Sequence, residues 1–215
     1  FYLKYLIVVR ELLKESQTNI PDFLDEKIFY LGKSYNLLFA NIKNGVLFNG
    51  NFDEPNKEFN EYLNFWKYKF KDDTNEAGGY IALKNKKSLL VIDIGKAPDR
   101  KFSKDYQAGL FSFEFSFLGE KVITNSGYFQ DYKHQLNIIS KSTATHSTLI
   151  LNNTSTVKFE RDKNGQMLVN KNFKILNKEI INEKNFWYIK ASHDAYLQSN
   201  GVIHERQLKY FHEKY

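Results

Sequence analysis

The 215-residue sequence contains no cysteine. Disulfide bonds, thiolate zinc sites and cysteine nucleophiles are therefore excluded, while the redox state of the compartment stays open. Long hydrophobic runs are also missing. The longest near the start is "YLIVV", whereas a membrane span needs roughly 18 to 20 apolar residues. The sequence thus predicts no segment that crosses a membrane.

Methionine is almost absent as well, because Met167 is the only one and the chain opens on Phe1 inside an apparent helical pattern. The last residues, "KYFHEKY", directly follow a strand-like segment. We therefore expect an internal piece of a longer protein, with the final domain truncated at its C-terminus. No oligomeric state is predicted.

Charge of one sign does not dominate. The 31 basic and 25 acidic residues leave a net charge of +6, and the lysines are scattered in short clusters at expected turns. Such clusters are typical of solvated hairpins. A nucleic-acid-binding domain, which would show a steep salt dependence of DNA binding, is a weak alternative.

Apolar periodicity indicates helices in the first third of the chain. Residues 3–16 carry apolar side chains at helical spacing. A second helix is predicted to begin near Pro21, because proline suits the first helical turn. Asn44-Gly45 predicts a tight hairpin between two apolar segments. A further helix is expected within residues 56–70.

Short alternating segments replace the helical pattern after Gly79. In "FSFEFSF", Phe111, Phe113, Phe115 and Phe117 would share one face of a strand, with Glu114 on the other. The turns between segments are of the glycine, asparagine and lysine kind that joins antiparallel neighbours. We predict an antiparallel β-sandwich with strands in 79–84, 88–94, 111–117, 120–126, 147–152, 156–161, 167–170, 185–192 and 202–210.

Generic catalytic motifs are missing: the sequence has no HExxH, GxSxG, Walker or GxGxxG pattern. The strongest candidate for chemistry is His146 in "STATHSTLILNN", because it precedes an apolar segment expected to be a strand. That position would place the imidazole at the margin of a sheet, facing a groove. A neutral imidazole there can bind a metal or a sugar if its other nitrogen is held by a partner.

Three segments resemble a known family. "QAGLFSFEFSFLGEKVITNSGYF", "KSTATHSTLILNNTS" and "HDAYLQSNGVIHERQL" look like the C-terminal half of the heparinase II/III-like family of polysaccharide lyases. The segment "IPDFLDEKIFYLGKSYNLLFANIKNGVLFNG" is similar to the chain that leaves that family's helical toroid. The resemblance implies a mainly β fold with N-terminal helices. Residues 1–75 would be the end of an incomplete (α/α) toroid with a linker, and residues 76–215 the heparinase II/III-like β-sandwich.

The resemblance also implies a reaction, β-elimination on an acidic, uronate-containing glycan such as a glycosaminoglycan or alginate. A base removes the proton from C5 of the uronate, and an acid protonates the leaving glycosidic oxygen. In the resembled lyases most of these groups come from the toroid, so the fragment alone is expected to be inactive. Enzymes that attack large external glycans work in the periplasm or outside the cell, which is the expected location.

The sequence departs from the family at its metal motif. The family's sandwich supplies a His-x-His-x-Asp segment, a later Asp and a His, and some of these hold a structural zinc. The matching positions here are Asp105, Gln107, Gly109 and Asn125, and only His146 is retained. Zinc prefers three or four nitrogen, sulfur or carboxylate ligands. A zinc site is therefore not expected, and a polar cluster of Gln107, Asn125 and His146 would take its place.

Other side chains complete the candidate site. His146 is the candidate catalytic residue, with structural support and substrate contact as the alternatives. Gln107 and Asn125 are candidate substrate contacts, as is Tyr128, which would stack on a sugar unless it is a core aromatic. His193, which opens "HDAY", is a further candidate substrate contact, and so is Arg206, which shares a strand face with His204. Arg206 would bind a uronate or sulfate, or pair with a nearby acid.

Two functions follow from these observations. The first is a polysaccharide lyase acting on an acidic polysaccharide. The second is a non-catalytic carbohydrate-binding or structural module that keeps the fold and has lost the metal and catalytic set.

Overall fold

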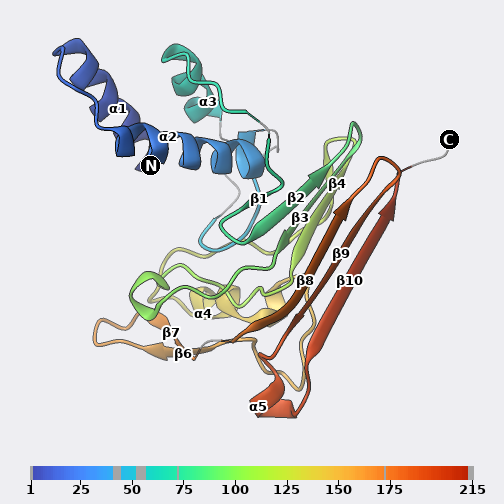
Figure 1. Cartoon of the computed structure of the whole chain (residues 1–215). Coiled ribbons are helices and arrows are strands. Elements are labelled where there is room, and N and C mark those ends of the chain that lie inside the picture. Colours follow the sequence, from blue (N-terminus) through green and yellow to red (C-terminus); the bar gives the residue numbers. More distant parts are fainter. Residues whose placement is uncertain (1, 41–44, 52–56, 72, 172, 213–215) are drawn as a thin grey trace. The chain divides into compact units, whose positions relative to one another are not determined.

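The computed structural model describes residues 2–40, 45–51, 57–71, 73–171 and 173–212. The chain forms two compact units (Figure 1). One comprises Phe1–Gly45 and Glu54–Gly78, and the other comprises Val46–Asp53 and Gly79–Tyr215. The expected division at residue 75 places residues 46–53 in the first domain, whereas in the structure this segment belongs to the second unit. Within the described ranges, no helix has the length and apolar character that a membrane span requires.

The first unit is helical, as the sequence predicts. Helix α1 spans Tyr2–Glu15 and α2 spans Asp22–Tyr35, with Pro21 at its N-cap. A π-helical turn, η1 (Asn36–Ala40), follows α2, and α3 spans Lys57–Phe65. Their buried core consists of Leu3, Ile7, Leu24, Ile28 and Leu63.

Gly32 allows a close approach within this unit, because a Cβ there would lie 2.0 Å from a ring carbon of Phe70. No toroid is present among the described residues, so the assignment of these helices to one stays a prediction. Asn44 of the predicted hairpin lies outside the described residues, and residues 46–48 do not form a strand.

The second unit is an antiparallel sandwich. Its larger sheet contains the strands β2-β3-β4-β5 in that order, and the smaller one has the order β10-β9-β8. The short strand β1, which pairs with β2, lies in the range of the first unit. Strands β6 and β7 form a separate hairpin. The bounds are β1 Glu76–Ala77, β2 Tyr80–Lys84, β3 Ser88–Asp93, β4 Phe113–Phe117, β5 Glu120–Ile123, β6 Lys158–Arg161, β7 Met167–Lys171, β8 Ile175–Asn182, β9 Phe186–His193 and β10 His204–Phe211.

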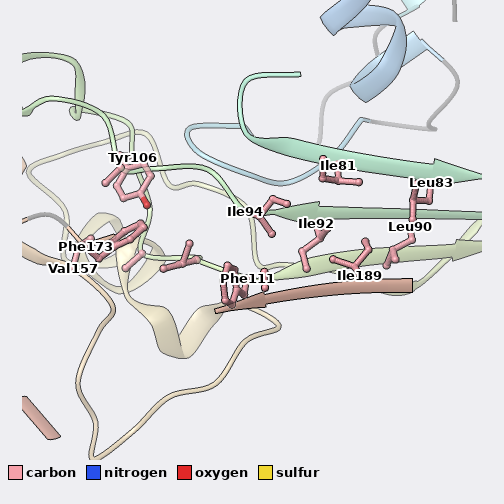
Figure 2. Packing of buried hydrophobic residues seen from close by; sticks show 14 of the residues in the cluster. Ile81, Leu83, Leu90, Ile92, Ile94, Tyr106, Phe111, Val157, Phe173 and Ile189 are labelled. Atoms are coloured by element: carbon pink, nitrogen blue, oxygen red, sulfur yellow. The ribbon is translucent and has the colours of Figure 1, made fainter. Parts of the chain in front are cut away.

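The core of the sandwich lies between the two sheets. Ile92 and Leu90 of β3 pack in the same buried cluster as Ile189 of β9, and the three lie side by side in Figure 2. Trp187 and Ala191 of β9 extend the cluster. Every second side chain of a strand faces the same side of the sheet, so the alternation of apolar and polar residues along β9 and β10 directs the apolar ones into the core. The predicted sandwich is thus confirmed.

Short helices connect the strands of this unit. They are η2 (Arg100–Phe102), α4 (Gln135–Lys141), η3 (Thr143–Thr145) and α5 (Leu197–Asn200). Helix α4 and strand β8 were not predicted from the sequence.

The predicted strand at residues 147–152 is wrong. This segment is a turn with one isolated bridge, Leu151 to Thr154. Side chains bind its carbonyl groups in place of a neighbouring strand: the Tyr196 hydroxyl donates to the Leu149 carbonyl over 2.7 Å, and Arg206 donates to the Ser147 carbonyl over 2.9 Å. The apolar run "TLIL" is therefore only partly buried.

The predicted phenylalanine face is also only partly correct. Phe111 has a φ of 60° and precedes β4, so it does not share the face of Phe113 and Phe115. Glu114, expected on the solvent side, is buried. Segment 46–51 accounts for this, since the Leu47 backbone N–H donates to the Glu114 carboxylate over 3.2 Å.

Candidate functional site

His146 follows the 3₁₀ turn η3, which ends the connection from α4. Its Nδ1 lies 2.8 Å from the Ser142 carbonyl oxygen. A carbonyl can only accept, so Nδ1 carries the proton and Nε2 presents a lone pair. Nε2 is buried and has no hydrogen-bond partner among the described residues. The loop thus fixes one tautomer and leaves one acceptor free.

The expectation of an open imidazole at the margin of a sheet is wrong, because the side chain of His146 is 8% exposed. The strand that would have displayed it is absent, and the loop folds its ring inward. Burial lowers the pKa of His146, against the opposing effect of the bond to Ser142. The ring is therefore neutral at neutral pH.

Gly109 lies directly against this ring. A Cβ at residue 109 would be 2.8 Å from Cδ2 of His146 and 3.0 Å from the Ser112 hydroxyl oxygen. The imidazole occupies the space that any side chain at this position would need. Gly109 matches an acid of the family's metal motif, so the local packing excludes that ligand here.

Gln107 is buried and forms three hydrogen bonds. Its amide nitrogen donates to the carbonyls of Gly127 over 3.0 Å and Ser140 over 2.6 Å. Its amide oxygen accepts from the Gly50 N–H over 3.2 Å. The side chain thus ties three segments together, and it is not placed to contact a substrate.

Asn125 and Arg206 both hold Ser147, the residue after His146. The Asn125 amide oxygen accepts from the Ser147 N–H over 3.0 Å, while its amide nitrogen is buried without a partner among the described residues. Arg206 donates to the Ser147 carbonyl and lies over the Phe113 ring at 5.5 Å. Burial lowers the pKa of Arg206. In the described ranges no carboxylate forms an ion pair with this guanidinium, so the expected acid partner is not found.

Tyr128 is buried, and a sugar has no access to its ring. Its hydroxyl donates to the Lys104 carbonyl over 3.4 Å, and the Lys141 ammonium lies 5.6 Å from its ring centre. Burial raises the pKa of Tyr128. Burial of the ring favours the structural alternative over stacking for this residue.

His193 lies in the core, with its ring centre 4.7 Å from that of Phe111. Its Nδ1 accepts from the Ala195 N–H over 3.1 Å, so Nε2 carries the proton and donates to Nδ1 of His204 over 3.0 Å. Burial, with His204 nearby, lowers the pKa of His193 to about 3, and burial with Arg206 lowers that of His204 to about 4. The fully buried His193 cannot contact a glycan as it stands.

The residues present do not fit a zinc ion. Among the described residues, no three His, Cys, Asp or Glu side chains gather into a metal-binding group. Asp105 is exposed, Gln107 is fully hydrogen-bonded and Gly109 has no side chain. His146 alone retains a metal-binding atom, which is too few for zinc.

Sequence reasoning missed two buried charged groups near this network. The Lys141 ammonium donates to the carbonyls of Tyr106 over 3.1 Å and Met167 over 3.2 Å, and also to that of Lys104. Burial lowers the pKa of Lys141 to about 8. Asp93, at the end of β3, is buried with a pKa raised by burial to about 7. The position of Asp93 within the apolar run "LLVIDI" was the sequence feature that could have indicated a buried acid.

Comparisons with known proteins agree on the fold. The structure resembles a crystal structure of a heparan sulfate lyase HepC mutant from Pedobacter heparinus, with a TM-score of 0.68 and 14% identity over 98% of this chain and 34% of that one. It also resembles a crystal structure of heparinase III, with a TM-score of 0.63 and 16% identity over 97% of this chain and 37% of that one. The chain thus spans about a third of the length of these enzymes. No curated protein matches the sequence.

A family profile matches the sequence directly. It is described as "Heparinase II/III-like, C-terminal" and covers residues 72–215, which include nearly all of the sandwich. The segments "STATHSTL" and "AGLFSFEFS", from which the resemblance was inferred, lie within the matched range. The chain belongs to the heparinase II/III-like family and carries its C-terminal domain.

Proposed function

We propose that this chain is the sandwich part of a polysaccharide lyase that cleaves a uronate-containing glycan by β-elimination. A base takes the C5 proton, the bond from C4 to the glycosidic oxygen breaks, C4 and C5 become doubly bonded, and an acid protonates the departing oxygen. The family match and the two lyases of the same fold support this proposal. The base and acid would come largely from helices outside this chain.

The fixed lone pair of His146 is the observation on which the proposal rests within this chain. The Ser142 carbonyl accepts from Nδ1–H, so the ring cannot turn without breaking this bond, and Asn125 and Arg206 hold the backbone of the next residue. A rigid acceptor of this kind orients a donor group beside it. We assign His146 the role of a positioning residue, since its ring is buried.

Two variants distinguish the roles of the two ring nitrogen atoms of His146. The amide N–H of His146→Asn can replace Nδ1–H, but asparagine has no atom at the place of Nε2. The longer side chain of His146→Gln reaches that place instead. We expect His146→Asn to lower kcat at least tenfold at an unchanged melting temperature, and His146→Gln to retain more activity. His134→Asn is the matched control, because His134 is exposed and its ring only caps α4 and contacts Phe129. Equal activity of wild type and His146→Asn would refute the role of His146 as a positioning residue.

The reaction itself is tested with the intact protein. A panel of glycosaminoglycans and alginate is incubated with it, and the unsaturated product is followed by ultraviolet absorbance. At least one polymer should give a rise in absorbance together with falling chain length. If no polymer is cleaved at any pH, with or without added zinc, the lyase proposal is wrong.

A non-catalytic carbohydrate-binding module is the second candidate. The observation in its favour is the conversion of the metal motif into a closed hydrogen-bond network around Gln107 and Gly109. This candidate predicts binding of an acidic polysaccharide by the intact protein without product formation, so the same panel distinguishes the two. In both cases we propose that the protein works outside the cytoplasm, where such polymers occur.

A further inference from the structure

A cavity of about 210 Å³ opens in the sandwich unit between the segment that enters β6 and the turn from β9 into α5. Helix α5 lies at the end of the smaller sheet where β9 connects to β10 (Figure 1). None of the six predicted site residues lines this cavity. The lining residues are Thr154, Ser155, Thr156, Val157, Lys158, Asp194, Ala195, Leu197, Gln198 and Ser199.

The hydroxyl groups on one side of the cavity are held by the fold. The Thr156 hydroxyl donates to the Ala108 carbonyl over 3.1 Å. The Ser155 hydroxyl accepts from the Thr143 N–H over 3.1 Å. Because these bonds fix the segment, the cavity wall is preformed, and a ligand would not have to order it on binding.

Two opposite charges line the same cavity without pairing. One carboxylate oxygen of Asp194 accepts from the Lys174 N–H over 2.7 Å, which holds the carboxylate, and among the described residues no donor binds its second oxygen. The Lys158 ammonium forms no ion pair within the described part of the chain, and the amide of Gln198 forms no hydrogen bond there. The cavity therefore offers one cation, one acceptor oxygen and one amide to a ligand.

We propose that this cavity is a subsite for a single hexuronate unit, separate from the His146 loop. Lys158 binds the sugar carboxylate. The free oxygen of Asp194 and the amide of Gln198 bind neighbouring hydroxyl groups of the ring. The cavity is smaller than the roughly 300–1,000 Å³ of sites for drug-sized ligands, which suits one sugar unit. That the sugar belongs to a glycan rests on the proposed function, whereas the charge arrangement does not.

The subsite is tested on this chain by NMR titration with methyl glucuronide and, as the neutral probe, methyl glucoside. We expect saturable amide shifts confined to residues 154–158 and 194–199. Lys158→Met should weaken binding of the glucuronide about tenfold and leave the glucoside unaffected. Asp194→Asn keeps the acceptor for Lys174 and should weaken both probes.

Lys163→Met is the matched control, because Lys163 is exposed in the turn between β6 and β7 and does not line the cavity. Absence of saturable shifts, equal binding of the two probes, or the same loss in Lys163→Met would each overturn the subsite. Failure here with eliminative cleavage intact would reject the subsite alone. Binding here without cleavage would reject the lyase function alone.

Discussion

Both units of the molecule bury carboxylates, and Glu11 of the helical unit and Asp93 of the sandwich behave oppositely. Glu11 of α1 is 9% exposed and Asp93 of β3 is 4% exposed. Burial raises the pKa of Glu11, but the Tyr68 hydroxyl at 2.8 Å and the cations of Lys14 and Arg10 outweigh it, so the net shift is downward. Asp93 accepts only from the neutral N–H groups of Gly95 and Asn49, and its pKa rises to about 7.

The difference shows that burial alone does not set the charge of an acid in this protein. The partners of the acid decide its charge: two cations and a hydroxyl contact Glu11, whereas neutral amides bind Asp93. The two units should therefore respond in opposite ways to pH. They also differ in core size, since among the described residues the buried apolar cluster has five residues in the helical unit and sixteen in the sandwich.

The largest effect is expected from the cores. Ile189→Ala in β9 should lower the free energy of unfolding of the sandwich by about 2–5 kcal/mol, and Ile28→Ala in α2 should fall at the lower end of that range. Each unit has its own tryptophan, Trp66 or Trp187. Denaturant unfolding followed by fluorescence in a Trp66→Phe background reports the sandwich. An equal loss in both units would contradict the difference in packing.

The next effect concerns Asp93. Its pKa in the folded protein is raised above the unfolded value, so its stabilising contribution is complete below about pH 4 and disappears as pH rises through 7. Relative to Asp93→Asn, which mimics the protonated acid, wild type should lose stability over this range. The loss is on the order of 4 kcal/mol at most. Parallel stability curves for the two proteins between pH 4 and 8 would refute the assignment.

The smallest effect is expected at Glu11, with the opposite sign. Its pKa in the folded protein lies below the unfolded value, so its contribution is complete above the unfolded pKa and disappears as pH falls through the folded one. Glu11→Gln should destabilise the helical unit by about 1–3 kcal/mol at neutral pH, and the deficit should shrink in acid. Circular dichroism of the helical signal measures it, and a deficit that stays constant down to pH 2 would contradict ion pairing.

Much of the fold could be predicted from the sequence. The alternation of apolar and polar residues predicts strands β9 and β10, and the helical spacing of apolar residues predicts helix α1. Strand β8 was missed because "ILNKEIIN" exposes most of its side chains and carries no clear period. Residues 147–152 were mistaken for a strand because the apolar pattern carries no information on the side chains of Tyr196 and Arg206, which bind the carbonyl groups of this segment.

The candidate site was less predictable. His146 was found through its position ahead of an apolar segment and then through the family resemblance, but its burial was not foreseen, since the loop that encloses it has no sequence period. The network depends on pairs far apart in the chain, such as Gln107 with Ser140 and Asn125 with Ser147. Local patterns carry no information on such contacts. Resemblance located the residues, and only the structure shows that most of them serve as supports.

Segment 46–51 has a practical consequence for anyone who expresses the sandwich by itself. A protein cut at the boundary of the family match would lack the backbone donors of Leu47 and Gly50 and the amide of Asn49. Three acceptors would each lose one donor at once: the carboxylates of Glu114 and Asp93 and the amide oxygen of Gln107. Such a piece should aggregate or melt early, whereas one that starts upstream of Val46 should yield soluble material.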